Sequence, residues 1–110
     1  MSKYVFLYYI GENGLTQEDM ESMDDSVMEA WGKWFESMGS NLVDGGNPFA
    51  PGGTYVDAKG ESGAIESWPA TGYSIVNAEN MEAAQEIAKG CPMLENNPDG
   101  VVRVFEALPM

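Results

Sequence analysis

The side chains of this sequence that could do chemistry are its carboxylates, its tyrosines, its lysines and one cysteine, because the 110 residues include no histidine. Histidine is the one side chain whose unperturbed pKa lies near neutrality, and it is also the commonest metal ligand. Acid–base catalysis would therefore depend on the remaining groups. No cysteine and histidine spacing typical of a metal site occurs, and no phosphate-binding or dinucleotide motif is present, so we expect neither a metal nor a cofactor.

Cys91 is either a nucleophile or a joint between two elements. It follows a predicted helix, whose negative C-terminal end disfavours a thiolate, although Lys89 opposes this effect weakly. Pro92 suits a position just after a helix end, because proline cannot continue the helix. We therefore predict that Cys91 is packed in the fold. A single cysteine forms no internal disulfide, which indicates a reducing compartment such as the cytoplasm.

A segment rich in glycine and proline, residues 45–72, holds several further candidates. Loops of this kind often carry function. Two carboxylates could act as acid and base if one were desolvated, but the spacing of the acids here also fits exposed loop residues. The acids in or beside the segment are Asp44, Asp57, Glu61 and Glu66.

Large aromatic side chains and one arginine complete the set of candidates. Tyr55 and Trp68 could close over a small molecule, or they could anchor the loop. Arg103 could bind a carboxylate ligand through two hydrogen bonds, or it could form an internal ion pair. The predicted ligand-binding cleft consists of Trp34, Asp44, Tyr55, Trp68, Tyr73 and Arg103.

The charge of the chain excludes two classes of partner. Eighteen acidic residues stand against five basic ones, which gives a net charge of -13. Such a surface repels nucleic acid and anionic lipid headgroups. No apolar run approaches the roughly 20 residues of a membrane span, and the apolar start has no basic leader followed by a small-residue cleavage site. We expect a soluble cytoplasmic protein with a single domain, residues 1–110.

Hydrophobic periodicity predicts the elements of the first half. Residues 4–10 form an apolar run that ends at Gly11, which predicts a buried strand. Apolar residues between Met20 and Met38 recur at steps of three and four, which predicts a helix of about six turns. Thr16 resembles the start of a capping box for this helix, and Gly39 should stop it.

The second half has its own signals. A helix is predicted at residues 81–89, where Asn80 can cap the N-terminus and Gly90 can end the helix in the left-handed conformation. Alternation and turn residues predict further strands, one of them within a short hairpin. These strands are residues 40–46, 54–57, 71–78 and 101–107.

The order β-α-β-β-β-α-β predicts a ferredoxin-like α+β fold, with two helices on one face of an antiparallel sheet. One face of the sheet is then left over. The strands carry more aromatic surface than two modest helices would cover, and an uncovered apolar face marks a partner surface, so we expect a homodimer. The aromatic residues concerned are Tyr4, Phe6, Tyr8, Tyr73 and Phe105.

Four stretches resemble the YCII-related (DGPF) domain family of the dimeric α+β barrel superfamily. They are KYVFLYY, WGKWFESMGSNLVDGGNPFAP, GYSIVNAENMEAAQEIAKGCP and VVRVFEALPM. The resemblance implies two ferredoxin-like protomers whose sheets face one another, with clefts between sheet and helices. In some members a His-Asp pair is proposed to do acid–base chemistry, and this chain has no histidine to supply it. Residues Asn47, Pro48 and Phe49 resemble only the end of the Asp-Gly-Pro-Phe signature.

Three functions remain open at this point. The first is a homodimeric domain that binds a small, apolar or neutral molecule or a partner protein, without histidine-based catalysis. The second is an enzyme acting on a small aromatic or lactone-like substrate, with Asp44 or a tyrosine moving the proton. The third is an assembly partner whose leftover sheet face is its whole function. The missing histidine favours the first function.

Overall fold

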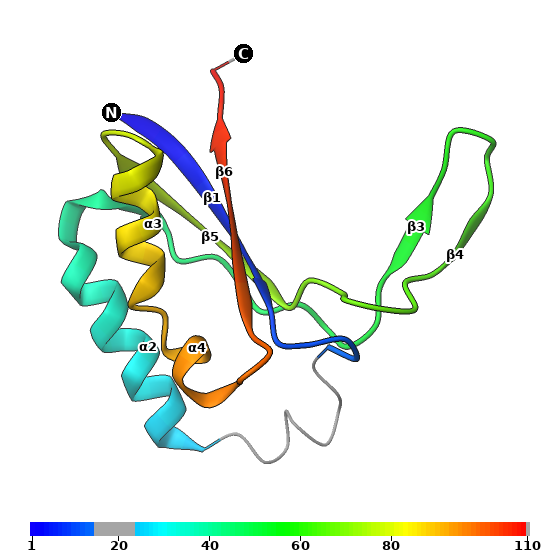
Figure 1. The fold of residues 1–110 in the computed structure, drawn as a ribbon, viewed down its shortest axis with the longest axis horizontal. Helices are drawn as coiled ribbons and strands as arrows, with labels where there is room; N and C mark the ends of the chain where they lie inside the picture. The colour runs from blue at the N-terminus through cyan, green and yellow to red at the C-terminus, as the bar shows by residue number, and fades with distance from the viewer. Residues whose placement is uncertain (15–23, 110) are drawn as a thin grey trace.

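The structure is a computed structural model that describes residues 1–14 and 24–109. Two long helices and a central group of strands form the framework of the described part (Figure 1). The elements in chain order are β1 (Ser2–Tyr9), α2 (Asp25–Met38), η1 (Gly39–Asn41), β2 (Leu42–Asp44), β3 (Thr54–Val56), β4 (Ser62–Ala64), β5 (Gly72–Ala78), α3 (Met81–Lys89), α4 (Pro92–Asn96) and β6 (Val101–Ala107).

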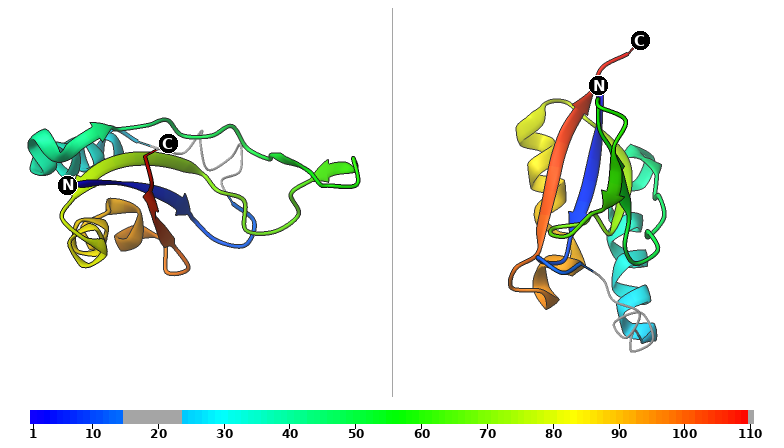
Figure 2. Two further views of the ribbon diagram at one scale, coloured as in Figure 1. Left: turned by 90° about the horizontal axis from the view of Figure 1, so that it is seen from above. Right: turned by 90° about the vertical axis from the view of Figure 1, so that its right-hand side faces the viewer.

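The architecture is α+β, as predicted. Four strands form an antiparallel sheet in the order β2-β5-β1-β6, and the helices cover one of its faces. This arrangement is compatible with the predicted ferredoxin-like fold. Strands β3 and β4 pair only with each other and form a separate hairpin, residues 54–64, which we call the arm. The arm stands away from the sheet (Figure 1), and the left-hand view of Figure 2 shows the same separation.

The face of the sheet under the helices, which we call the inner face, carries the core. Tyr4, Phe6 and Tyr8 of β1 point to this side and are buried. Three of the five strand aromatic residues behind the homodimer expectation are therefore covered by the helices of their own chain. Phe6 and Tyr8 pack against tryptophans of α2, and the rings of Phe6 and Trp34 stack with centroids 6.3 Å apart. Both faces of β1 carry apolar residues. The alternation of side chains along the strand therefore could not predict which face the helices cover.

The opposite face, which we call the outer face, is covered by no described element. Its register places Val5 between Ile75 and Phe105, and Leu7 between Tyr73 and Arg103. Tyr73 and Phe105, the other two of the five strand aromatic residues, lie on this side. The outer face consists of Lys3, Val5, Leu7 and Tyr9 of β1, Tyr73, Ile75 and Asn77 of β5, and Val101, Arg103, Phe105 and Ala107 of β6.

Helix α2 lies within the predicted helix, and the part of that prediction at residues 20–23 lies outside the described residues. Asp24 is the N-cap of α2, and its carboxylate accepts hydrogen bonds from the backbone N–H groups of Ser26 (3.1 Å) and Val27 (3.3 Å). Hydrogen bonds from Ser26 hold the pKa of the Asp24 carboxyl below its usual value. The helix ends at Gly39, as predicted, where φ is 56°. The predicted cap Thr16 lies outside the described residues.

The C-terminal part differs from the prediction at one turn. Asn80 caps α3 by accepting a hydrogen bond from Ala83 N–H (2.8 Å), as predicted. The left-handed conformation predicted for Gly90 is wrong, because its φ is -82°. An added Cβ there would lie 3.1 Å from Nε1 of Trp34, so a close approach explains the glycine. The chain then continues into the five-residue helix α4, which is too short to show a helical period.

Candidate functional site

The six residues of the predicted cleft do not line one cleft. Trp34 is buried under the inner face, whereas Tyr73 and Arg103 belong to the outer face. Tyr55 lies on the arm, and Asp44 ends the edge strand β2. Because Trp34 and Tyr73 leave opposite faces of the sheet, no ligand could touch both side chains from one side.

Two of these residues serve local structure. The Asp44 carboxylate accepts a hydrogen bond from the backbone N–H of Gly46 (2.8 Å), which closes a turn after β2. The backbone N–H of Trp68 donates to the carbonyl oxygen of Glu12 (2.6 Å), so it ties the loop before β5 to the turn after β1. This contact agrees with the anchoring alternative for Trp68, although the bond comes from its backbone and its ring stays exposed.

The tryptophan of α2 links the two long helices. The indole Nε1 of Trp34 donates a hydrogen bond to the carbonyl oxygen of Ile87 in α3 (3.2 Å). Its ring also contacts Tyr8 and Phe6 of β1. The indole N–H of Trp34 is therefore hydrogen-bonded and its ring is packed, so Trp34 has a structural role in the core.

Arg103 forms a contact that the sequence did not predict. Its guanidinium carbon lies 4.8 Å from the centre of the Tyr9 ring, which is a cation–π geometry. The ion-pair alternative for Arg103 is not formed among the described residues, where the ion pair joins Lys89 and Glu86 (2.6 Å). The outer-face positions of β1, β5 and β6 include no carboxylate, so nothing of opposite charge lies beside Arg103 on these strands.

A buried polar pair lies on the inner face, and sequence reasoning missed it. The hydroxyl of Tyr8 donates a hydrogen bond to Oγ of Ser74 (2.7 Å), which donates to the carbonyl oxygen of Gly45 (2.7 Å). Burial raises the pKa of Tyr8 above its usual value. Both hydroxyl protons are engaged and the tyrosine stays protonated near neutrality, so the pair joins β1, β5 and the loop after β2 and supplies no base.

Cys91 is completely buried, which confirms its predicted packing role. Burial raises the pKa of its thiol to about 11, and backbone hydrogen bonds from Met93 and Leu94 lower that pKa by less. The thiol is therefore protonated at neutral pH. A protonated thiol without access to solvent is not a nucleophile.

The raised pKa of Cys91 predicts a loss of stability in alkali. The thiol titrates near pH 9.0 in the unfolded chain and near pH 11 in the folded one, so the unfolded chain loses its proton first as the pH rises. Between about pH 8 and pH 10.5 the free energy of unfolding should fall by about 2 kcal/mol more in the wild type than in Cys91→Ala. Urea denaturation at both pH values measures this difference. Equal losses in the two proteins would contradict the assignment.

A groove lies beside the edge strand β6. It has a volume of about 410 Å³ between α3, α4 and β6, and small-molecule sites commonly measure 300–1,000 Å³. The ammonium of Lys89 at its rim is held by Glu86. The groove is lined by Met81, Gln85, Ala88, Lys89, Leu94, Val102 and Val104.

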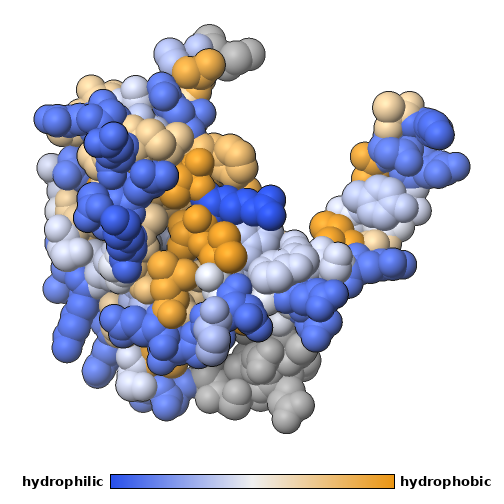
Figure 3. All heavy atoms as spheres, in the orientation of Figure 1, coloured by the Kyte–Doolittle hydropathy of each residue, from blue (hydrophilic) through white to orange (hydrophobic). Residues whose placement is uncertain are grey.

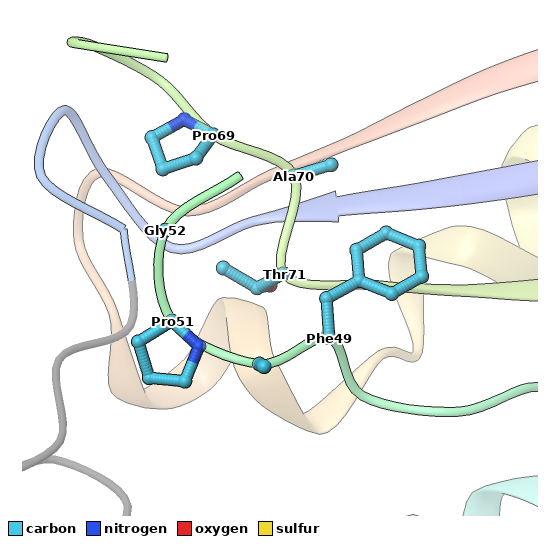
Figure 4. Close-up of a pocket in the computed structure, with 7 residues that line it drawn as sticks. Phe49, Pro51, Gly52, Pro69, Ala70 and Thr71 are labelled. Carbon is cyan, nitrogen blue, oxygen red and sulfur yellow. The ribbon is translucent and has the colours of Figure 1, made fainter. Parts of the chain in front are cut away.

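A second hollow lies where the loop after β2 meets the loop before β5 (Figure 4). Phe49, Pro51 and Thr71 surround it, and the Phe49 ring also stacks on Tyr73 with centroids 5.9 Å apart. Its volume is about 10 Å³, which is about the space that one water molecule needs. This loop junction is therefore closed by packing and holds no organic ligand.

Comparison with known proteins assigns no family. No protein-family model matches the chain, and no curated protein is significantly similar to it. Within residues 1–14 and 24–109, no three acidic, cysteine or histidine side chains gather closely enough to hold a metal ion. In the same ranges no helix is both long and apolar enough to cross a membrane. The resemblance to YCII-related domains stays a prediction.

Proposed function

We propose that this chain is a homodimeric interaction domain in which a second copy covers the outer face. The observation that carries the proposal is the apolar surface of three long strands that no described element covers. Phe105 is 51% exposed and Val101 is 40% exposed on this surface. Figure 3 shows apolar side chains gathered over β6 and the neighbouring strands, facing the hollow between the sheet and the arm. Apolar patches of this kind mark interaction sites.

Charge favours the same surface. Two copies of a chain with net charge -13 repel one another unless they meet where acidic groups are few. The outer-face positions of β1, β5 and β6 carry two of the five basic residues, Lys3 and Arg103, and no carboxylate. The outer face is thus the surface on which self-association costs least electrostatically.

The sheets of the two copies would then face one another, as the resemblance to YCII-related domains and dimeric α+β barrels implies. Facing sheets pack about 10 Å apart when side chains of both faces interdigitate. The half-buried Val5 and Leu7, at the centre of the outer face, are of the type that fills such a layer. The single unpaired cysteine supports the predicted cytoplasmic location.

Sedimentation equilibrium of the wild-type chain tests the proposal. At micromolar concentration we expect the mass of two chains of 11.9 kDa each. A single-chain mass that persists as the concentration is raised would contradict both the dimer and the barrel.

A second candidate function, supported by the groove beside β6, is the binding of a small, uncharged and largely apolar molecule. Five of its seven lining residues are apolar, and its one ammonium is neutralised by Glu86. A ligand at about a hundred times its dissociation constant should add about 2.7 kcal/mol of stability. We expect some phenols or lactones to raise the melting temperature of the wild type, but not of Gln85→Trp, which fills the groove. Equal shifts in both proteins, or none across a broad screen, would contradict this site.

A further inference from the structure

The arm is the part of the molecule that the fold itself does not explain. A two-stranded hairpin is at best marginally stable alone, and the arm pairs with no third strand. The radius of gyration is 14.9 Å, whereas a compact domain of this length has about 13 Å. In the space-filling view the arm is separated from the body of its own chain by an open gap (Figure 3).

One side of the arm is apolar and uncovered. Tyr55 pairs with Gly63, and the ladder continues to Ile65, whose N–H donates to the carbonyl oxygen of Gly53 (3.0 Å). Tyr55 and Ile65 therefore lie on the same side, where they are 48% and 39% exposed. We call this side the arm face. Exposed apolar residues on so small an element indicate that something else covers it.

The arm and the outer face have complementary charges. Asp57 and Glu61 flank the arm turn, with Lys59 between them, so acidic groups exceed basic ones there. The Asp57 carboxylate accepts from the backbone N–H groups of Lys59 and Glu61 (3.0 Å each), which holds it beside the arm face. The outer face presents Arg103, and the outer-face positions of β1, β5 and β6 hold no carboxylate. Opposite charges on two surfaces of one chain favour contact between two copies.

We propose that the arm of each copy packs on the outer face of the second copy, along β6. Tyr55 and Ile65 then cover Val101 and Phe105, which are more exposed than the apolar outer-face residues of β1 and β5. The acidic arm turn faces Arg103 of the other copy. This inference rests on the proposed homodimer. It adds that the arm of each copy covers the surface around Arg103 of the other copy.

Crosslinking between two differently tagged chains tests this contact. One chain carries Ile65→Cys on the arm, and the other carries Val101→Cys on the outer face. The native Cys91 is completely buried and does not react. A short thiol crosslinker should join this pair about tenfold more than the control pair, in which Met28→Cys on α2, 66% exposed, replaces Val101→Cys. Sedimentation under the same conditions reports the oligomeric state.

The crosslinking yields and the oligomeric state together decide between the arm contact and the homodimer. Equal yields with Val101→Cys and Met28→Cys would overturn the proposal, as would a crosslink that forms within one chain carrying both Ile65→Cys and Val101→Cys. A dimer by sedimentation without the Ile65 crosslink would overturn the arm contact and leave the homodimer standing. A monomer by sedimentation would overturn the homodimer itself.

Discussion

Replacing Gly46 by alanine is expected to lower the free energy of unfolding by about 2–5 kcal/mol, as the cost of overpacking adds to that of a left-handed alanine. Gly46 has φ 74°, and a Cβ added to it would lie 1.7 Å from the carbonyl oxygen of Tyr73 and 2.6 Å from its carbonyl carbon. These are backbone atoms of β5, which cannot rotate away as a side chain would. The loop after β2 must therefore move off the sheet.

Gly52→Ala is the matched control for this prediction. Gly52 also has a positive φ, 95°, but no atom lies within 4 Å of an added Cβ. Only the conformational cost of about 1–2 kcal/mol applies there. Urea denaturation of both variants separates the two effects. If the two alanines cost the same, the contact between Gly46 and the carbonyl of Tyr73 is not as close as the structure has it.

Phe105→Lys is expected to raise the dissociation constant of the proposed homodimer at least about 100-fold, which is the effect of losing a strong interface residue. The Phe105 side chain is half exposed within one copy, so its loss should change the fold of the single chain little. In a covered interface the new ammonium would be desolvated. It would also lie beside Arg103 on strands whose outer-face positions hold no carboxylate.

Met28→Lys makes the same change of charge at an exposed position of α2, on the helix side of the sheet. We expect its dissociation constant to stay within about threefold of the wild type, since surface substitutions outside an interface change energies by under about 0.5 kcal/mol. Sedimentation velocity over a dilution series measures both variants. Comparable weakening by the two lysines would show that net charge, and not the outer face, controls association.

The local elements could be predicted because their signals lie within a few neighbouring residues. The helix at residues 81–89, its cap Asn80 and the strand at residues 101–107 all have the predicted bounds. Capping and hydrophobic period act between residues close in sequence. The start of α2 was less predictable, because Asp24 caps it inside a stripe that reads as continuous helix.

The candidate site could not be predicted because it depends on contacts between distant residues. Whether Tyr8 or Leu7 faces the helices is decided by packing and not by alternation, since both are apolar. The contact of Arg103 with Tyr9 follows from the register of β1 with β6. The groove beside β6 needs α4, whose five residues give no periodic signal.

The most direct test of the central claim is an isotope-filtered NMR measurement on a mixture of labelled and unlabelled wild-type chains, which detects only contacts between different copies. We expect such contacts for the side chains of Val5, Leu7 and Phe105, which line the outer face. Contacts confined to the helices, or none at concentrations where the chain is a dimer by sedimentation, would contradict the claim that a second copy covers this face.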